Sequence, residues 1–257
     1  MLGEMYSTLG YYLSVEEVTE LEGAFQNPQL LESDQAPMRR AAASCITSFL
    51  RSFPLDRTKS VVDSILKAHY AKPDNLELHH SALLTLLSVT KERRTSATTD
   101  TDPLIDVLPQ VLQLCSTSMT HSDPLIVGPA LEIVCQVLTD HNTKSELWAN
   151  KECTKSLDDI SLVMHKFSVD NTCRMSTRAL SIECLALLVN GWPVSKTVSL
   201  FDSAHIHLFA DLIKTEQDPL MRGNLTVFFS RLIIAFAREF SLVTLDNKLI
   251  PLETIAD

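Results

Sequence analysis

Apolar and polar positions follow one another along the chain in blocks with the 3.6-residue spacing of amphipathic helices. Five of these blocks follow an aspartate, with Pro or another residue suited to a first helical turn shortly after it. An aspartate accepts hydrogen bonds from the free amides at a helix N-terminus, and Pro has no amide to satisfy. The pattern therefore predicts five helices that begin near Asp34, Asp74, Asp123, Asp170 and Asp218.

These helix starts recur at a nearly constant interval. The separations between successive aspartates are 40, 49, 47 and 48 residues. Fifteen residues after each aspartate stands an apolar side chain, as equivalent core positions of a repeat require: Phe49, Val89, Leu138, Leu185 and Ile233. A second amphipathic segment precedes each helix, over residues 14–26, 57–71, 103–119, 155–168 and 203–215. We therefore expect five helical hairpins, each covered by its neighbours in a stack.

The interval is close to the ~40 to 47 residues of HEAT and armadillo repeats. The second helices also resemble the HEAT signature, in which Asp, Arg and Ala follow one another, and the clearest cases are Asp34, Arg39 and Ala42 and then Asp170, Arg174 and Ala179. Asp218 with Arg222 is a partial match, whereas the units of Asp74 and Asp123 lack the Arg. The resemblance covers about residues 14–240 and implies an all-α, right-handed α-solenoid of about five HEAT/ARM-like helical hairpins.

The predicted organisation is a single α-solenoid domain over residues 1–257. Its units span about 14–53, 57–91, 103–139, 155–190 and 203–241. Segments 1–13 and 245–257 are expected to cap the stack, or to be the edges of a longer solenoid.

Several local signals refine this organisation. Ser14 and Glu17 have the spacing of a capping box, which predicts a helix start. Residues 91–102 lack apolar periodicity and predict an exposed loop. A short helical turn is expected at 145–150, and the Asn, Gly and Pro of 190–193 predict the end of the fourth unit.

Charge is distributed unevenly over the chain, whose formal net charge is -10. Residues 39–94 carry 10 basic and 5 acidic side chains, and the segments on both sides are acidic. The acidic total argues against a general binder of the phosphate backbone. The basic island still leaves an alternative function, a nucleic-acid-associated HEAT-repeat protein that uses the 39–94 region. Its cations are Arg51, Arg57, Lys59, Lys67, Lys72, Lys91, Arg93 and Arg94, and a solvated helix face explains them equally well.

The residues give no signature of catalysis, a metal or a cofactor. The chain has 6 Gly and no G-x-S-x-G, G-x-G or G-K-[ST] sequence. The pairs His79–His80 and His205–His207 do not have the i,i+3 or i,i+4 spacing of a helical metal pair, nor is the spacing of Cys153, His165 and Cys173 suitable. The absence of any His-Glu dipeptide argues against the HEAT-type iron hydroxylases. We therefore expect no enzyme activity, no catalytic residue, no cofactor and no metal.

The expected location is intracellular, cytoplasmic or nuclear. The six cysteines form no C-x-x-C pair, which favours reduced thiols over a disulfide framework. The N-terminus lacks a basic segment followed by an apolar one, and no uninterrupted apolar run approaches ~18 residues. No membrane association is predicted.

A candidate binding surface lies early in the second helices. Stacked repeats bring equivalent positions side by side, and here those positions are cationic or titratable. They are Arg39, Arg40, His79, His80, Arg174, Arg178 and Arg222, and the third unit interrupts the row. One hypothesis is a basic ridge that receives an acidic or phosphorylated segment of a partner protein. The alternative is structural: the arginines pair with the aspartates of their own or the next unit and hold the stack together.

The fifth second helix is a further candidate. Its large apolar residues surround the helix nearly completely, so part of this surface needs cover beyond its own hairpin. They are Phe228, Phe229, Ile233, Ile234, Phe236 and Phe240. The cover is expected from the C-terminal tail or from another subunit. The predicted function is accordingly a non-enzymatic protein–protein interaction scaffold or adaptor, a subunit of a multiprotein complex that binds a partner segment through its second helices.

Overall fold

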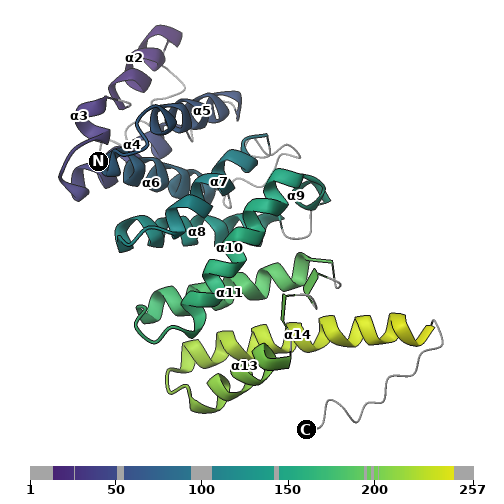
Figure 1. Cartoon of the computed structure of the whole chain (residues 1–257). Coiled ribbons are helices and arrows are strands. Elements are labelled where there is room, and N and C mark those ends of the chain that lie inside the picture. The colour runs from purple at the N-terminus through teal and green to yellow at the C-terminus, as the bar shows by residue number, and fades with distance from the viewer. Residues whose placement is uncertain are drawn as a thin grey trace. The chain divides into compact units, whose positions relative to one another are not determined.

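The described part of the chain is built of helices joined by turns (Figure 1). The computed structural model describes residues 14–25, 27–50, 55–93, 106–141, 145–193, 196–197, 200–201 and 203–245. Within these residues there are helices and no strand. The predicted all-α class is therefore confirmed.

The long helices fall in the segments that the apolar periodicity predicts. The first unit contains α2 (Val15–Phe25), the short α3 (Pro28–Leu31) and α4 (Ala36–Leu50). The later units contain α5 (Leu55–Ala71) with α6 (Leu76–Arg93), α7 (Leu108–Met119) with α8 (Pro124–His141), α10 (Lys151–Val169) with α11 (Met175–Gly191), and α13 (Ser203–Thr215) with α14 (Pro219–Leu245). The short helix α9 (Ser145–Ala149) lies at the predicted inserted turn.

Side-chain caps start several of these helices. The Ser14 amide donates to Glu17 Oε2 at 2.8 Å, and the Glu17 amide donates to Ser14 Oγ at 3.3 Å, so the capping box is confirmed. Hydrogen bonding from the backbone and the side chain of Ser14 lowers the pKa of the exposed Glu17 carboxyl. Asp123 accepts from the amide of Leu125, and Asp218 accepts from that of Met221, both at 2.8 Å.

The other three aspartates do not begin their helices in this way. Asn75 rather than Asp74 accepts an amide of α6, that of Leu78. Asp170 accepts from both the amide and the hydroxyl of Thr172, in a turn that precedes α11. Each helix therefore begins near its aspartate, but the aspartate is not always the residue that caps it.

Some predicted boundaries were wrong. The helix expected from 103 begins at Leu108, because residues 106 and 107 form a turn. The loop expected from Lys91 begins later, because residues 91–93 continue α6, and the rest of that loop lies outside the described residues. The helix expected from about 155 begins at Lys151, because Asn150 accepts from the amides of Glu152 and Cys153 and caps it there.

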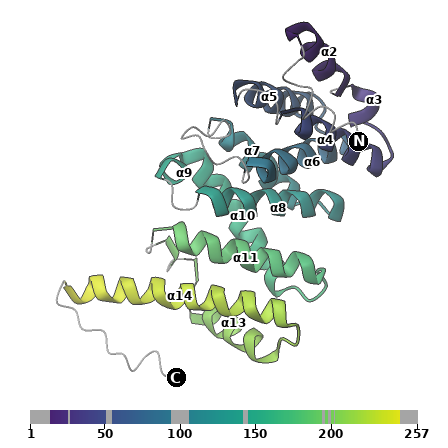
Figure 2. The same cartoon turned by 180° about the vertical axis from the view of Figure 1, so that it is seen from behind.

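The chain divides into two compact units, each described here by itself. Unit 1 comprises Met1–Asp140 with Glu146–Ile160, and unit 2 comprises His141–Ser145 with Ser161–Asp257. In unit 1, α4 packs against α6, and α5 packs against α6. In unit 2, α14 runs alongside α11, and α13 packs on α14 (Figures 1 and 2). In both units, second helices of successive predicted hairpins are therefore in contact.

The core confirms most of the equivalent apolar positions and corrects one. Val89, Leu138 and Leu185 are buried, as predicted, and the Phe49 side chain lies outside the described residues. Ile233 is 54% exposed, so the prediction that it belongs to the core was wrong. The core residue of α14 in this region is Phe228 instead. Its side chain is fully buried, and its ring centroid lies 4.7 Å from that of Phe209.

Candidate functional site

The predicted cationic row is largely internal. Four of its members lie in unit 1 and three in unit 2. The side chains of Arg39, His79, His80 and Arg178 are buried, which removes them from the surface offered to a partner. The exposed members are Arg40, Arg174 and Arg222.

In unit 1, Arg39 and His80 form a buried pair. Arg39 on α4 donates through Nε to His80 Nδ1 on α6 at 3.0 Å, and its Nη1 donates to the carbonyl of Ser33. Since His80 Nδ1 accepts, this imidazole is neutral and carries its proton on Nε2. Burial lowers the pKa of His80, and the nearby Arg39 and Arg40 lower it further, whereas Asp123 opposes them.

His79 is held in the same way by α7. Its Nε2 lies 2.7 Å from Ser118 Oγ, and that hydroxyl donates to the Leu114 carbonyl at 2.6 Å. Because that hydroxyl donates its proton to Leu114, Ser118 Oγ accepts from a protonated Nε2 of His79. Burial, together with smaller contributions from His69, His121 and His80 as neighbouring positive charges when protonated, lowers the pKa of His79 to about 4.

A third imidazole completes this cluster. His69 on α5 is buried with its ring centroid 4.5 Å from that of His79, and burial lowers the pKa of His69 as well. The three buried histidines are thus neutral at neutral pH and cannot supply positive charge to an acidic partner. In unit 1, hydrogen bonds of His80 and His79 thus join α6 to α4 and to α7, and the ring contact of His69 with His79 joins α5 to α6.

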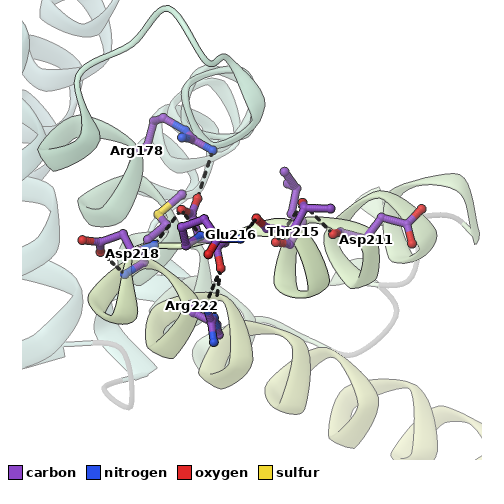
Figure 3. A network of polar contacts seen from close by, with 9 residues as sticks. Arg178, Asp211, Thr215, Glu216, Asp218 and Arg222 are labelled. Carbon is purple, nitrogen blue, oxygen red and sulfur yellow. Dashed lines mark hydrogen bonds and ion pairs between the residues drawn. The ribbon is translucent and has the colours of Figure 1, made fainter.

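In unit 2, Arg178 and Arg222 converge on the turn between α13 and α14 (Figure 3). Arg178 Nη2 on α11 lies 3.7 Å from Glu216 Oε2, and both side chains are largely shielded from solvent. Arg222 donates through Nε and Nη2 to the Glu216 carbonyl at 3.0 and 2.7 Å. Glu216 Oε1 accepts from the amides of Gln217 and Asp218. One glutamate therefore connects α11, the turn and the first residues of α14.

We expect Arg178→Met to lower the free energy of unfolding of unit 2 by about 1 to 3 kcal/mol, because it leaves the Glu216 carboxylate shielded without its cation. Urea denaturation followed by circular dichroism measures this change. The matched control is Arg174→Met, which alters an exposed arginine of the same predicted row and should change stability by less than about 0.5 kcal/mol. Equal effects of the two variants would show that the Arg178–Glu216 contact contributes nothing specific.

The partners of the arginines agree in part with the structural alternative, which predicted pairing with the unit aspartates. Arg178 contributes to lowering the pKa of Asp170, the aspartate of its own unit, and also lies 3.7 Å from Glu216. Arg39 contacts a histidine and a carbonyl, and Arg222 contacts the carbonyl of Glu216. Asp218 and Asp123 are used as helix caps. The buried members of the row, Arg39, His79, His80 and Arg178, thus contribute to internal packing by contacts with residues about 40 positions away in the sequence.

The basic island of residues 39–94 is partly neutralised. Lys59, Lys72 and Lys91 each lie 2.6 Å from a carboxylate, those of Asp106, Glu32 and Glu132 respectively. These pairs are exposed, so each contributes little to stability. Lys67 is exposed, and the side chains of Arg51, Arg57, Arg93 and Arg94 lie outside the described residues. The nucleic-acid alternative stays a prediction.

The side chains with metal-binding or nucleophilic chemistry are dispersed. Within the described ranges, no three His, Cys, Asp or Glu side chains lie close enough together to hold a metal ion. His165 and His205 approach to 4.7 Å between ring centroids, in a cluster with Phe201 and Phe209. Burial raises the pKa of the Cys115 thiol well above its usual range, and raises that of Cys153 to about 11 with a further contribution from Glu152. These two thiols are therefore protonated and unreactive at neutral pH.

The most conspicuous exposed feature is an apolar face on α14. Leu220, Val227, Ile233 and Ile234 are 68%, 48%, 54% and 51% exposed. Of the residues predicted to surround this helix, Phe228 is fully buried, Phe229 and Phe236 are half-buried, and the Phe240 side chain lies outside the described residues. The sequence analysis did not single out Leu220 and Val227. A signal was present, because Leu220, Val227 and Ile234 follow one another at intervals of seven residues, which places them on one side of a helix.

The fold and these contacts define an all-α protein in which polar contacts join neighbouring helices within each of the two units. No protein-family model matches the chain, and comparison with curated proteins finds no significant match. The resemblance to HEAT and armadillo repeats therefore stays a prediction. Within the described residues, one helical stretch, Pro219–Ala237 of α14, is long and apolar enough to cross a membrane by length and composition alone, a test that core helices of other proteins also pass.

Proposed function

We propose that the chain is a non-enzymatic protein–protein interaction scaffold or adaptor, a subunit of a multiprotein complex built from about five stacked HEAT/armadillo-like hairpins. In this proposal the second helices provide the binding surface, and α14 provides its apolar part.

Polar contacts between helices support the stacked arrangement. In unit 1, Arg39 with His80 and His79 with Ser118 join residues 41 and 39 positions apart. In unit 2, Arg178 with Glu216 and Asn224 with the Ala179 carbonyl join residues 38 and 45 positions apart. These separations are close to one predicted repeat, as expected when each hairpin packs on the next one along the chain.

The exposed apolar face of α14 is the observation that carries the binding function. A helix face in contact with water usually bears charged side chains. Residues 219–237 of α14 contain no Asp, Glu or Lys, and their only charged side chains are Arg222 and Arg231. Burying such a face against another protein removes apolar surface from water, at about 25 cal/mol per Å². A binding surface is the simplest use of a helix with this composition.

Affinity capture of the full chain from cell extract, with and without nuclease, tests this proposal. We expect defined protein partners that survive nuclease and that are lost with Val227→Asp, because a carboxylate in the centre of the face is costly to bury. Leu162→Asp is the matched control, since Leu162 is a leucine of another helix, α10, and is likewise exposed, at 55%. Capture that collapses with nuclease would instead support the nucleic-acid function of residues 39–94.

A further inference from the structure

The exposed face of α14 contains a regular seam of alternating large and small residues. The outer seam consists of Leu220, Gly223, Val227, Ser230, Ile234 and Ala237, all of them exposed. Successive members are three and four residues apart in alternation, the spacing of two helices that pack along their length with a small crossing angle. Large residues recur every seven positions, and a small residue follows each of them after three.

A second seam with the same spacing faces the interior of unit 2. Met221, Leu225, Phe228, Leu232 and Ala235 are buried, and α14 packs on α11 and α13. At about 100° per residue, the inner and outer seams lie on nearly opposite sides of the helix. The helix thus has one seam occupied within the chain and an equivalent one facing outward.

The outer seam is complementary to itself when two copies run antiparallel. In such a pair, Leu220 of one copy lies level with Ala237 of the other, Gly223 with Ile234, and Val227 with Ser230. Each level therefore joins one large residue and one small one, so that the side chains interdigitate and the helix axes approach closely. A parallel pair would place Gly223 opposite Gly223 and Leu220 opposite Leu220, which leaves voids at one level and crowding at the next.

Charge is compatible with this arrangement. In the antiparallel alignment, Arg222 lies level with Ala235 of the other copy and Arg231 with Thr226, so that no two arginines face each other. A two-fold interface requires the same patch on both copies to be complementary to itself, and the outer seam meets that condition.

We propose that the outer seam of α14 binds the outer seam of a second copy of this chain, antiparallel about a two-fold axis between Val227 and Ser230. The inference rests on the proposed protein-binding function of α14 and names the occupant of its apolar face. In such a dimer the outer seam of α14 is buried, and the surfaces of the other second helices are present twice. This arrangement suits a scaffold that holds two partners together.

Gly223 provides the sharpest test of this packing. A Cβ added at Gly223 would find nothing within 4 Å inside the chain, so Gly223→Leu leaves the fold intact and even improves helix propensity. In the dimer, the new leucine would lie opposite Ile234 of the other copy. That position has room for one large side chain, so the two would clash. We expect the dimer dissociation constant to rise by about 10-fold or more. For Val227→Asp, which places two carboxylates beside the two-fold axis, we expect a rise of about 100-fold or more.

Sedimentation equilibrium of the full chain, over about 1 to 100 µM, measures these constants. The expected mass at the upper concentration is twice the 28.6 kDa of one chain. Gly23→Leu is the matched control, because Gly23 is also an exposed helical glycine with nothing within 4 Å of an added Cβ, and it should leave the dimer unchanged. Helical circular dichroism confirms that each variant is folded.

The proposal is overturned by a single-chain mass at every concentration, or by a dimer that neither Gly223→Leu nor Val227→Asp weakens. A monomer that dimerises only when Leu249→Asp and Ile250→Asp are introduced would show that the C-terminal tail covers the seam instead. A monomeric chain that still captures a partner through Val227 would leave the proposed function standing and overturn only the self-association.

Discussion

Phe228→Ala is expected to lower the free energy of unfolding of unit 2 by about 3 to 5 kcal/mol, the largest effect of any substitution considered for this protein. The Phe228 ring is fully buried, with its centroid 4.7 Å from that of Phe209 and 5.4 Å from that of Phe201. Truncation would remove both edge-to-face contacts and leave a cavity between α14 and the elements that cover it. Urea denaturation followed by circular dichroism measures the loss.

Ile233→Ala is the informative control for this substitution. Ile233 lies fifteen residues after Asp218 and was predicted to occupy the core, but it is 54% exposed. Its truncation should cost less than about 1 kcal/mol, because little surface is lost from the interior. If Ile233→Ala cost as much as Phe228→Ala, then the orientation of α14 would have to differ from the one described.

Lowering the pH from 7 to about 4.5 is expected to lower the free energy of unfolding of unit 1, with His79 as the largest single contributor. The pKa of His79 is about 4 in the folded chain and 6.5 in a solvated histidine. Between these values the unfolded chain binds more protons than the folded one. The His79 contribution is therefore complete above pH 6.5 and is lost as the pH falls towards 4, by roughly 2 kcal/mol.

The difference between the native chain and His79→Gln isolates this contribution from the acid titration of carboxylates. Glutamine has an amide donor for Ser118 Oγ but no titratable group. We expect urea denaturation at pH 4.5 and at pH 7 to give a smaller change for His79→Gln than for the native chain. The groups that face His79 and His80 and would shift the midpoint are His69, His121, Arg39, Arg40 and Asp123. Equal pH dependence in both proteins would mean that His79 is hydrated or protonated in the folded state.

Helix positions were predictable because their signals are local. The Ser14–Glu17 box, the Asp123 and Asp218 caps and the end of α11 at Gly191 each involve residues within a few positions of one another. A side chain that caps an amide at a helix start usually lies within three residues of it, so the capping residues carry this information by themselves. Even the short α9 was visible as an interruption of the longer pattern.

Local sequence signals did not predict whether the side chains of the polar row are buried or exposed. Arg39, His79 and His80 read as surface residues because they are polar and stand early in a helix. They are buried because His80 lies opposite Arg39, and Ser118 opposite His79, on helices about 40 residues away. A buried polar group is stable only when such a partner is present, and a single sequence does not specify which distant side chain supplies it.

The sequence by itself determined the all-α class seen in the described residues and where most of their helices begin and end, and it predicted an interval of 40 to 49 residues between equivalent points. These properties depend on neighbours along the chain and on periodicity within one helix. Only the tertiary structure decided which face of α14 is covered, because Ile233 and Phe228 are equally apolar and their burial depends on where α11 and α13 lie. Packing between helices assigned one of them to the core and left the other on the surface.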